Sequence, residues 1–494
     1  MAEHDNTPGS GQSLQPARYE QPLDELDVVV GEALVAQVPE SNQAQVTPTP
    51  NWARTVTSYP TVIARPESEA DVIALLRDTA NYPAPVRPMG HYHSTTACAV
   101  TQQGTLVDMT RMKEVIEITD QFVRVQAGAQ FLDVMHALKA QGLHFPVDLQ
   151  IGNVTLGSLA TCDTKDGAYP GGFGQFGAYV THVRLVSPAG EVLDIDDTQP
   201  DLFRAVRSSY GLLGIVTEVT VQVEAIPSVS IEHKKYSFES FVAAYPQLCE
   251  RNGSMMVYLF PFADRIIAQL RSPGDPHRRR NRWVWPLRNF GVAWVVSLFA
   301  RLANLIRIST LRYFIQQTFN AAARFMLVHI VKAANTDPTQ QTTDYPDDPR
   351  LACFTFSIFA FPLHRFPQVL MAYQTFCWNY YNATSYRPDL LTVGYHVTRS
   401  DYATFSYSAE GDVFTIDPVA TGGEGWEAFV AAFNEFAITQ GGKPLFNQSP
   451  GLQSEQVQKA YGGALAEFES VRHQLDPERR MMNAYFAELL MPAA

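Results

Sequence analysis

The stretch PVRPMGHYHSTT (residues 85–96) places two histidines one residue apart behind a glycine, at the end of a proline-flanked segment. A zinc site would need a third ligand at a suitable spacing, and none accompanies His91 and His93. A bare pair of histidines in a loop is more often structural than functional. The remaining alternatives are a catalytic pair and a histidine that holds another group, so the flanking sequence has to be considered.

Short strands and helices mix irregularly on both sides of this stretch. Residues 61–90 predict a strand, a capped helix and a second strand. Strands in GTLVDMTRM (104–112) and FVRVQAGAQ (122–130) then precede a helix in FLDVMHALKAQG (131–142). This irregular order predicts an α+β fold rather than a doubly wound parallel sheet.

A glycine-rich stretch occupies residues 148–177, DLQIGNVTLGSLATCDTKDGAYPGGFGQFG. Seven of its thirty residues are glycine, well above the usual frequency of roughly 7%. Glycine allows backbone N–H groups to approach a ligand closely. A hairpin with the turn SPAG (187–190), a helix and a β-branched strand follow and close this unit near residue 226.

The segment around His93 resembles the flavin-binding loop of the vanillyl-alcohol oxidase superfamily, the FAD-binding oxidoreductases of PCMH type. That loop is typically a strand ending in R-x-x-G-G-G-H-S, in which the histidine is often bonded to the 8α-methyl group of the flavin. His93 stands at the position of that histidine, whereas His91 stands where a glycine is usual. The resemblance implies FAD as the cofactor, covalently linked through His93.

Three further motifs follow in the order of this superfamily. The stretch FVRVQAGAQFLDVMHALKAQGLHFP (122–146) resembles its V-x-A-G-A strand and the next helix, and TLGSLATCDTKDG (155–167) resembles its second loop, T-I-G-G-x-x-S-T-G-T-H-G. The stretch YGLLGIVTEVTV (210–221) resembles the strand that completes the flavin domain. Small residues in such loops let backbone amides meet the pyrophosphate of the cofactor.

The C-terminal part resembles the aldonolactone and alditol oxidase branch. GGKPLFNQ (441–448) and LDPERRMMNAYFAELL (475–490) are similar to the branch's R-P-H-W-x-K and D-P-x-x-x-F-x-N-x-Y elements. In the first element, Leu445, Phe446 and Gln448 replace the histidine, tryptophan and lysine. A terminal helix that docks on the core would explain the same tail in purely structural terms.

The resemblance implies a set of cofactor-binding residues in these motifs. They are Met89, Gly90, His91, Tyr92, His93, Ser94, Gly152, Thr155, Gly157, Ser158, Thr161, Asp163, Thr164, Gly214, Ile215, Val216, Asn483 and Tyr485. Asp163 stands where the family usually has glycine, and it could touch the flavin or only cap the loop. Tyr169 stands where doubly attached relatives carry a cysteine, so we expect at most one covalent bond.

The stretch LLTVGYHVTRSDYATFSYSA (390–409) corresponds to the strand that carries a Glu-x-Arg pair in the alditol and lactone oxidases, but it lacks that pair. We predict His396 as the catalytic base, because histidine titrates near neutral pH, with Tyr395, Tyr407 and His91 as further candidates. A packed or exposed histidine is the structural alternative. A polyol would leave unpaired polar groups here at about 1–3 kcal/mol each, so a hydrophobic or amphipathic alcohol is expected as substrate.

Composition limits the possible partners and the compartment. The chain has 494 residues and a formal net charge of −13, which argues against nucleic acid as a partner. Five scattered cysteines without a CxxC pair indicate neither a disulfide framework nor a structural metal, and we expect a cytoplasmic protein. We see neither a signal peptide nor an apolar run that could span a bilayer.

Residues 276–336 carry ten lysines and arginines and no acidic residue, although the average composition of the chain would give about six. Their interleaved aromatic and aliphatic residues predict an amphipathic helical pair with a basic rim. Such a pair suits peripheral contact with an anionic membrane or an oily substrate, its basic charge could equally meet an anionic substrate, and a buried helix pair in a cap domain is an equal alternative.

These observations predict a mobile arm over residues 1–50, an FAD-binding domain over 55–226, an α+β substrate or cap domain over 227–440 and a returning segment over 441–494. We expect an FAD-dependent oxidoreductase that transfers hydride from a CH–OH group to flavin N5, with oxygen or another compound as electron acceptor. The alternatives are a flavin-dependent C=C reductase or desaturase, and a flavin-containing binding protein at a membrane surface that lacks catalysis.

Overall fold

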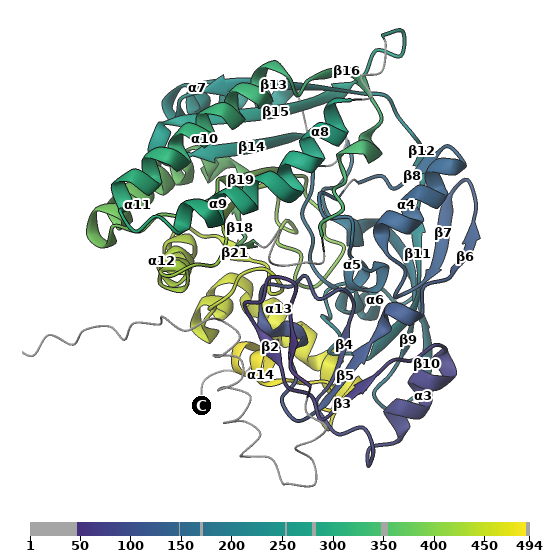
Figure 1. Cartoon of the computed structure of the whole chain (residues 1–494). Coiled ribbons are helices and arrows are strands. Elements are labelled where there is room, and N and C mark those ends of the chain that lie inside the picture. The colour runs from purple at the N-terminus through teal and green to yellow at the C-terminus, as the bar shows by residue number, and fades with distance from the viewer. Residues whose placement is uncertain are drawn as a thin grey trace, which may run out of the picture. The chain divides into compact units, whose positions relative to one another are not determined.

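The computed structural model describes residues 47–147, 149–167, 171–251, 254–278, 283–346 and 354–490 (Figure 1). Tyr169 and residues 1–46 of the predicted arm lie outside these ranges. The last residues of that arm pair as β1 (Thr49–Pro50) with β2 (Thr57–Ser58).

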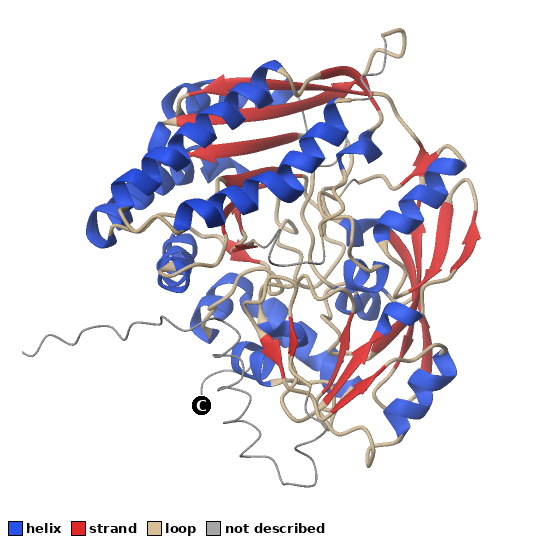
Figure 2. Ribbon diagram, in the orientation of Figure 1, coloured by secondary structure: helices blue, strands red, loops and turns tan. Residues whose placement is uncertain are grey.

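The N-terminal part of the described chain contains two main sheets (Figure 2). The first is parallel, in the order β3 (Val62–Ala64), β5 (Thr105–Asp108) and β4 (Val86–Met89). The second is antiparallel, in the order β10 (Val192–Ile195), β9 (Val180–Val186), β11 (Ile215–Gln222), β7 (Phe122–Gln126) and β6 (Val115–Ile118). The accompanying elements are α3 (Glu69–Arg77), α4 (Phe131–Ala140), α5 (Leu156–Thr161), α6 (Pro200–Val206) and the pair β8 (Leu143–His144) with β12 (Glu224–Ala225).

Helix α3 shows how the local sequence fixes these elements. The Ser68 hydroxyl accepts a hydrogen bond from the Asp71 backbone N–H, and the Asp71 carboxylate accepts one from the Ser68 N–H. This capping box satisfies donors that a helix start would otherwise leave unpaired. Val72, Leu75 and Leu76 are spaced on one face and are buried, so they hold the helix on the sheets.

A larger antiparallel sheet follows in the chain. Its order is β16 (Ala333–Thr336), β13 (Val229–Tyr236), β15 (Arg265–Pro273), β14 (Met255–Phe260), β19 (Thr392–Val397), β20 (Val413–Ala420), β18 (Phe359–Pro362) and β21 (Lys443–Pro444), with β17 (Thr355–Phe356) also on β20. Helices α7 (Phe238–Arg251) and α11 (Phe366–Thr384) contact one face, and α10 (Ser309–His329) contacts the other (Figure 1). Helix α12 (Trp426–Thr439) packs its aromatic residues against α11.

Strand β14 reads MMVYLF and is buried throughout, because the large sheet is covered on both faces. Met255, Val257 and Leu259 belong to the core that includes α7 and α11. Met256 and Tyr258 belong to a second cluster on the opposite face. The period of two along a strand therefore assigns alternate side chains to different faces.

The acid-free segment forms α8 (Val284–Phe290), a π-helical turn at Gly291–Val296, α9 (Ser297–Asn304) and α10. A helical structure was predicted for it, and the structure confirms this. No helix within the described ranges combines the length and the apolar character needed to cross a membrane.

The C-terminal helices α13 (Ser454–Leu475) and α14 (Ala484–Leu490) lie beside the N-terminal sheets (Figure 1). The fully buried Arg87 of β4 donates hydrogen bonds to the carbonyls of Met481 (2.6 Å) and Tyr210 (2.5 Å), and Asn483 donates to the carbonyl of Val100 (2.8 Å). The α+β fold with strands and helices in irregular order confirms the predicted fold class. The boundaries near residues 226 and 440 stay predictions.

Candidate active site

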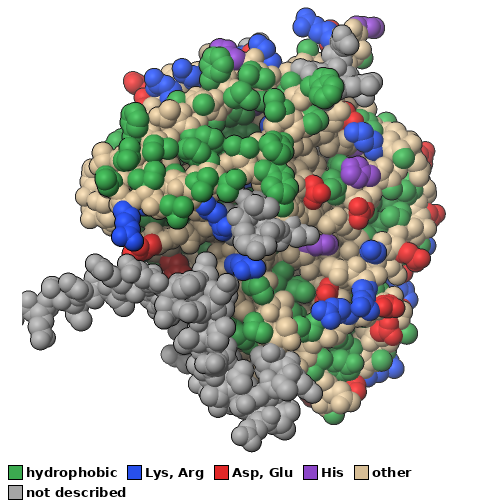
Figure 3. All heavy atoms as spheres, viewed as in Figure 1, with side chains coloured by type: hydrophobic (Ala, Val, Ile, Leu, Met, Phe, Trp, Pro, Cys, Tyr) green, Lys and Arg blue, Asp and Glu red, His purple; other side chains and the backbone are tan. Residues whose placement is uncertain are grey.

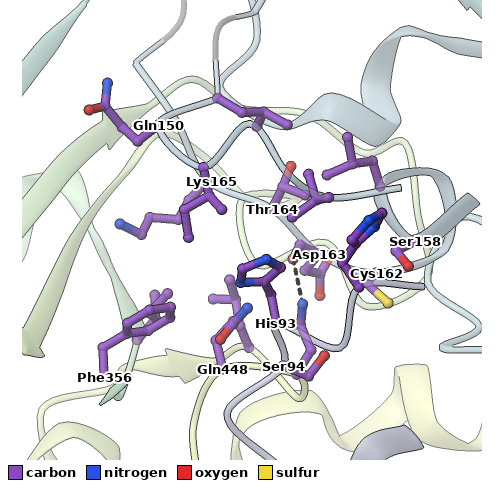
Figure 4. A pocket seen from close by; sticks show the side chains of 18 of the residues that line it. His93, Ser94, Gln150, Ser158, Cys162, Asp163, Thr164, Lys165, Phe356 and Gln448 are labelled. Atoms are coloured by element: carbon purple, nitrogen blue, oxygen red, sulfur yellow. Dashed lines mark hydrogen bonds between the residues drawn. The ribbon is translucent and has the colours of Figure 1, made fainter. Parts of the chain in front are cut away.

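A cavity of about 360 Å³ lies where the glycine-rich loops face the large sheet. One side is formed by the loop after β4, by α5 and by the stretch from Thr161 to Asp166. The other is formed by β14, β19 and β20 and by the turn between α8 and α9. Figure 4 shows Ser158 and Cys162 on one side of His93, and Lys165 and Phe356 on the other.

Close backbone contacts shape the loop side of the cavity. A Cβ added at Gly90 would collide with Thr155 Oγ1, and one at Gly157 would lie 2.8 Å from Ala127 Cβ. Gly214 has φ +141°, where a side chain would be strained. Glycine is therefore required at these positions, because the strands and loops approach one another more closely than any side chain allows.

His93 is held in a fixed position beside the cavity. Its ring lies against Trp52, with the ring centroids 5.0 Å apart, and its Nε2 is buried without a hydrogen-bond partner in the described part of the chain. Burial, together with the neighbouring His91, lowers the pKa of His93 to about 3. The imidazole is therefore neutral at physiological pH, and its free nitrogen is available as a nucleophile or an acceptor.

Asp163 is a buried carboxyl on the loop side. The hydroxyls of Tyr210 and Tyr402 donate to it at 2.6 and 3.2 Å, and the Asn447 amide donates to its backbone carbonyl at 3.2 Å. Burial raises the pKa of Asp163 to about 7, although the two tyrosine hydrogen bonds lower it. These contacts fix the loop that carries Thr164 and Lys165.

A polar cluster occupies the opposite end of the cavity. Lys165 Nζ lies 2.5 Å from Asp417 Oδ2 and 3.9 Å from the centroid of the Tyr395 ring. Asp417 is only 2% exposed, and burial raises its pKa while the Lys165 ammonium opposes that rise. Asp166 is adjacent, and burial raises its pKa to about 7 against the lowering effect of Lys165. Charged groups are thus concentrated at one corner of the cavity.

Apolar side chains form most of the remaining wall. They come from five separate parts of the chain: Met256, Val292, Val296, Phe354, Phe356, Ile358, Leu390, Leu391, Val393 and Val419. The cavity therefore combines one charged corner with a long apolar surface.

The donor and acceptor set on the loop side fits a flavin. His93 Nε2 and Gln448 Oε1 line the cavity, are buried and have no hydrogen-bond partner among the described residues. Buried polar atoms without a partner are costly, by about 1–3 kcal/mol each, so both fit a ligand with polar ring edges. Among the described residues, no group of three or more His, Cys, Asp or Glu side chains is arranged to hold a metal ion.

Comparison with protein families agrees with this geometry. Residues 60–196 match the FAD binding domain, and residues 219–489 match the family described as D-arabinono-1,4-lactone oxidase. The second match alone covers more than half of the chain. The chain belongs to the D-arabinono-1,4-lactone oxidase family. This is a family of FAD-dependent oxidoreductases, so the predicted superfamily, its aldonolactone branch and FAD as the cofactor are confirmed.

Relatives of this D-arabinono-1,4-lactone oxidase family member include L-gulono-1,4-lactone dehydrogenase of Mycobacterium tuberculosis, 28% identical over 46% of this chain and 52% of that protein. The chain thus spans about half the length of the first curated relatives it matches. L-gulonolactone oxidase of Scyliorhinus torazame is 20% identical over 88% of this chain and 96% of its own. Cholesterol oxidase from B. sterolicum has a similar fold, with a TM-score of 0.68 at 12% identity, covering 92% of this chain and 99% of that one.

Most of the predicted cofactor-binding residues lie around the cavity. Those that line it are Met89, Gly90, His91, Tyr92, His93, Ser94, Thr155, Gly157, Ser158, Thr161, Asp163, Thr164, Gly214 and Val216. Four do not line it: Gly152 packs against Thr342, Ile215 lies in a core cluster, Asn483 caps carbonyls near Val100, and Tyr485 donates to the Phe446 carbonyl. These four residues pack behind the walls of the cavity and do not line it.

Of the three predicted catalytic residues in the stretch 390–409, only one lies at the cavity. Tyr395 lines the cavity, but His396, the next residue of β19, points to the other face of the sheet, where its ring lies 6.3 Å from that of Phe414. His396 Nε2 lies 3.5 Å from Asp412 Oδ2. Tyr407 donates to the Thr164 carbonyl at 2.7 Å from behind the loop. The structure therefore does not bring His396 or Tyr407 to the cavity.

The sequence motifs did not predict the pair of Lys165 and Asp417. One signal was present, because Lys165 directly follows Thr164 in the second glycine-rich loop, where the family pattern has a histidine. Asp417 carries no such signal. It is a single acidic residue in strand β20, 252 residues after Lys165, and only the fold brings the two side chains together.

Proposed function

We propose that this protein is an FAD-dependent oxidoreductase that oxidises a CH–OH group of a hydrophobic or amphipathic alcohol and passes the electrons to oxygen or another acceptor. The observation that carries the proposal is the cavity with one charged corner and a long apolar wall beside it. A single hydroxyl can be paired at the corner while the rest of the molecule is buried against aliphatic and aromatic side chains.

The pair of Lys165 and Asp417 supplies the proton chemistry in this proposal. When bound, FAD supplies the acceptor for the hydride that leaves the carbon. The Asp417 carboxylate takes the hydroxyl proton, and its raised pKa makes it a better acceptor than an ordinary aspartate. The Lys165 ammonium stabilises the negative charge that grows on the oxygen as the proton leaves.

Tyr395 is proposed as a positioning residue rather than as the base. Burial raises its pKa well above the ordinary value of a tyrosine, so the phenol keeps its proton at neutral pH. Its ring lies under Lys165 Nζ at 3.9 Å, and this cation–π contact holds the ammonium beside Asp417.

Substitution of Asp417 tests the proposed base. The experiment measures anaerobic bleaching of the flavin absorbance by long-chain primary alcohols. We expect Asp417→Asn to slow bleaching by about 10²- to 10⁴-fold, the usual contribution of a general base. Asp412→Asn is the matched control, because Asp412 is a carboxylate beside His396 on the opposite face of the sheet. Wild-type bleaching rates in Asp417→Asn, with full FAD content, would contradict the assignment.

We also propose that His93 carries the flavin covalently, since its imidazole is neutral, its Nε2 is buried without a partner in the described part of the chain, and the residue lines the cavity. Acid denaturation of the wild type should leave a yellow polypeptide heavier by one FAD. His93→Ala should release the flavin into the supernatant, while His91→Ala should keep it attached. A wild-type polypeptide that turns colourless in acid would refute the bond without refuting FAD binding.

A second candidate substrate class is favoured by the family match. The relatives are named as oxidases and dehydrogenases of aldonolactones, whose hydroxyls would need several polar partners. Arg288 lines the cavity and donates to Gln150 at 2.5 Å, and Tyr258 also lines it, so some partners exist. Faster bleaching by L-gulono-1,4-lactone than by every apolar alcohol would favour this class.

A further inference from the structure

The outer face of the helices between α8 and α10 is apolar, although surface helices normally expose a polar face. Trp283 is 84% exposed, Leu305 76% and Phe314 69%. Apart from the adjacent Trp294 and Val295, successive exposed apolar residues from Trp283 to Leu305 are three or four positions apart, as expected for one stripe on a helix. We call the following residues the apolar face: Trp283, Leu287, Phe290, Trp294, Val295, Leu298, Leu302, Leu305, Ile308, Leu311, Phe314, Phe325, Met326 and Ile330.

Polar contacts on the inner side hold these helices in this orientation. Trp285 Nε1 donates to Thr336 Oγ1 at 2.6 Å, and Asn304 donates to the Asp389 carboxylate at 2.6 Å. Arg288, which is nearly buried, donates to Gln150. Turning the helices to hide their apolar residues would break these bonds, so the exposure of the apolar face is fixed by the fold.

The charge of the segment that carries the apolar face is of one sign. The 61 residues from Pro276 to Thr336 hold ten of the 37 lysines and arginines and none of the 50 acidic residues of the chain. Arg307 and Lys332 are exposed. Figure 3 shows apolar side chains gathered over these helices, with basic side chains and some acidic ones at the edges of the area rather than within it.

We infer that the apolar face docks on an anionic lipid surface. An apolar area with a basic border matches the acyl region and the negative headgroups of such a surface. A second copy of the chain fits less well, because a symmetric contact through this face would bring the two basic borders together. The rest of the chain is strongly acidic, so charge would orient this face toward the lipid.

The helical turns that carry the docking surface also line the cavity with other residues, and this step rests on the proposed function. Val292, Val296 and Ser297 line the cavity, while Trp294, Val295 and Leu298 of the same two turns belong to the apolar face. An alcohol dissolved in the lipid would therefore meet the protein beside its substrate cavity. The structure accordingly assigns the substrate to compounds that partition into membranes.

Co-sedimentation with vesicles tests the docking without any substrate. The full-length protein is mixed with vesicles of phosphatidylcholine alone or of phosphatidylcholine with phosphatidylglycerol. We expect strong sedimentation with the anionic vesicles, weakened by salt. Arg307→Gln/Lys332→Gln should bind about five-fold more weakly for each charge removed.

The apolar contribution is tested by Leu298→Glu/Leu302→Glu, which should abolish sedimentation. Val115→Glu/Ile116→Glu is the matched control, because these two exposed apolar residues lie on β6, outside the helical segment. The flavin spectrum of each variant reports whether the fold is intact. Full sedimentation of Leu298→Glu/Leu302→Glu, or a wild type that forms a stable dimer through this face and does not sediment, would overturn the inference.

Activity separates this inference from the proposed function. Anionic vesicles that contain a long-chain alcohol should bleach the wild-type flavin faster than they bleach that of Leu298→Glu/Leu302→Glu, while the two proteins respond equally to the same alcohol in detergent. Vesicle binding without bleaching by any alcohol would refute the oxidase proposal and leave the docking in place. Bleaching in detergent without vesicle binding would refute the docking alone.

Discussion

At the residue scale, Asp163 links stability to pH. Its pKa is about 7 in the fold, mainly through burial, against roughly 3.9 in an unfolded chain. Between these values the folded state binds more protons than the unfolded state, so the free energy of unfolding falls as pH rises from 4 to 7. One such group contributes up to about 1.4 kcal/mol per pH unit. Asp163→Asn, measured by urea denaturation at pH 5, 6 and 7, should show a smaller slope than the wild type.

A second buried carboxyl contributes to the same pH dependence, so Asp163→Asn is compared with a variant at an exposed carboxylate. Asp166 also has its pKa raised to about 7, so part of the pH dependence remains in Asp163→Asn. Asp412→Asn, at a carboxylate 38% exposed, should leave the wild-type slope unchanged. Equal slopes for Asp163→Asn and the wild type would show that Asp163 is already ionised in the folded protein at acidic pH.

At the element scale, strand β19 carries a residue of the cavity on one face and a residue of the core on the other. Tyr395 and His396 are neighbours in the sequence, yet they lie on opposite faces of the sheet. Tyr395→Leu should lower the flavin bleaching rate by about ten-fold, because Lys165 loses the ring that holds it. His396→Gln should keep the rate within about two-fold and cost about 1–2 kcal/mol of stability, since it disturbs a buried ring. If His396→Gln bleached slowly but had normal stability, His396 would again be a candidate for the catalytic base.

The same element shows what the sequence can and cannot predict. Alternation along β19 could have placed Tyr395 and His396 on different faces, but it does not tell which face meets the cofactor. Local motifs sufficed for His93, Gly90 and Gly157, because close backbone contacts leave a glycine pattern in the sequence. The ion pair of Lys165 with Asp417 arises from the pairing of distant strands, and no local pattern marks it.

At the scale of the whole molecule, five separate parts of the chain supply the apolar wall of the cavity, so we expect the preference for a substrate to increase with its apolar surface. Each buried methylene contributes about 0.8 kcal/mol, which is about four-fold in the apparent second-order rate of flavin bleaching. Straight-chain primary alcohols from butanol to decanol should therefore give rates that rise with length until the cavity is filled. Leu391→Asn, on the apolar wall, should flatten the rise, whereas Ile116→Asn on exposed β6 should not. Rates independent of chain length, together with rapid bleaching by aldonolactones, would show that polar contacts at the charged corner set the specificity.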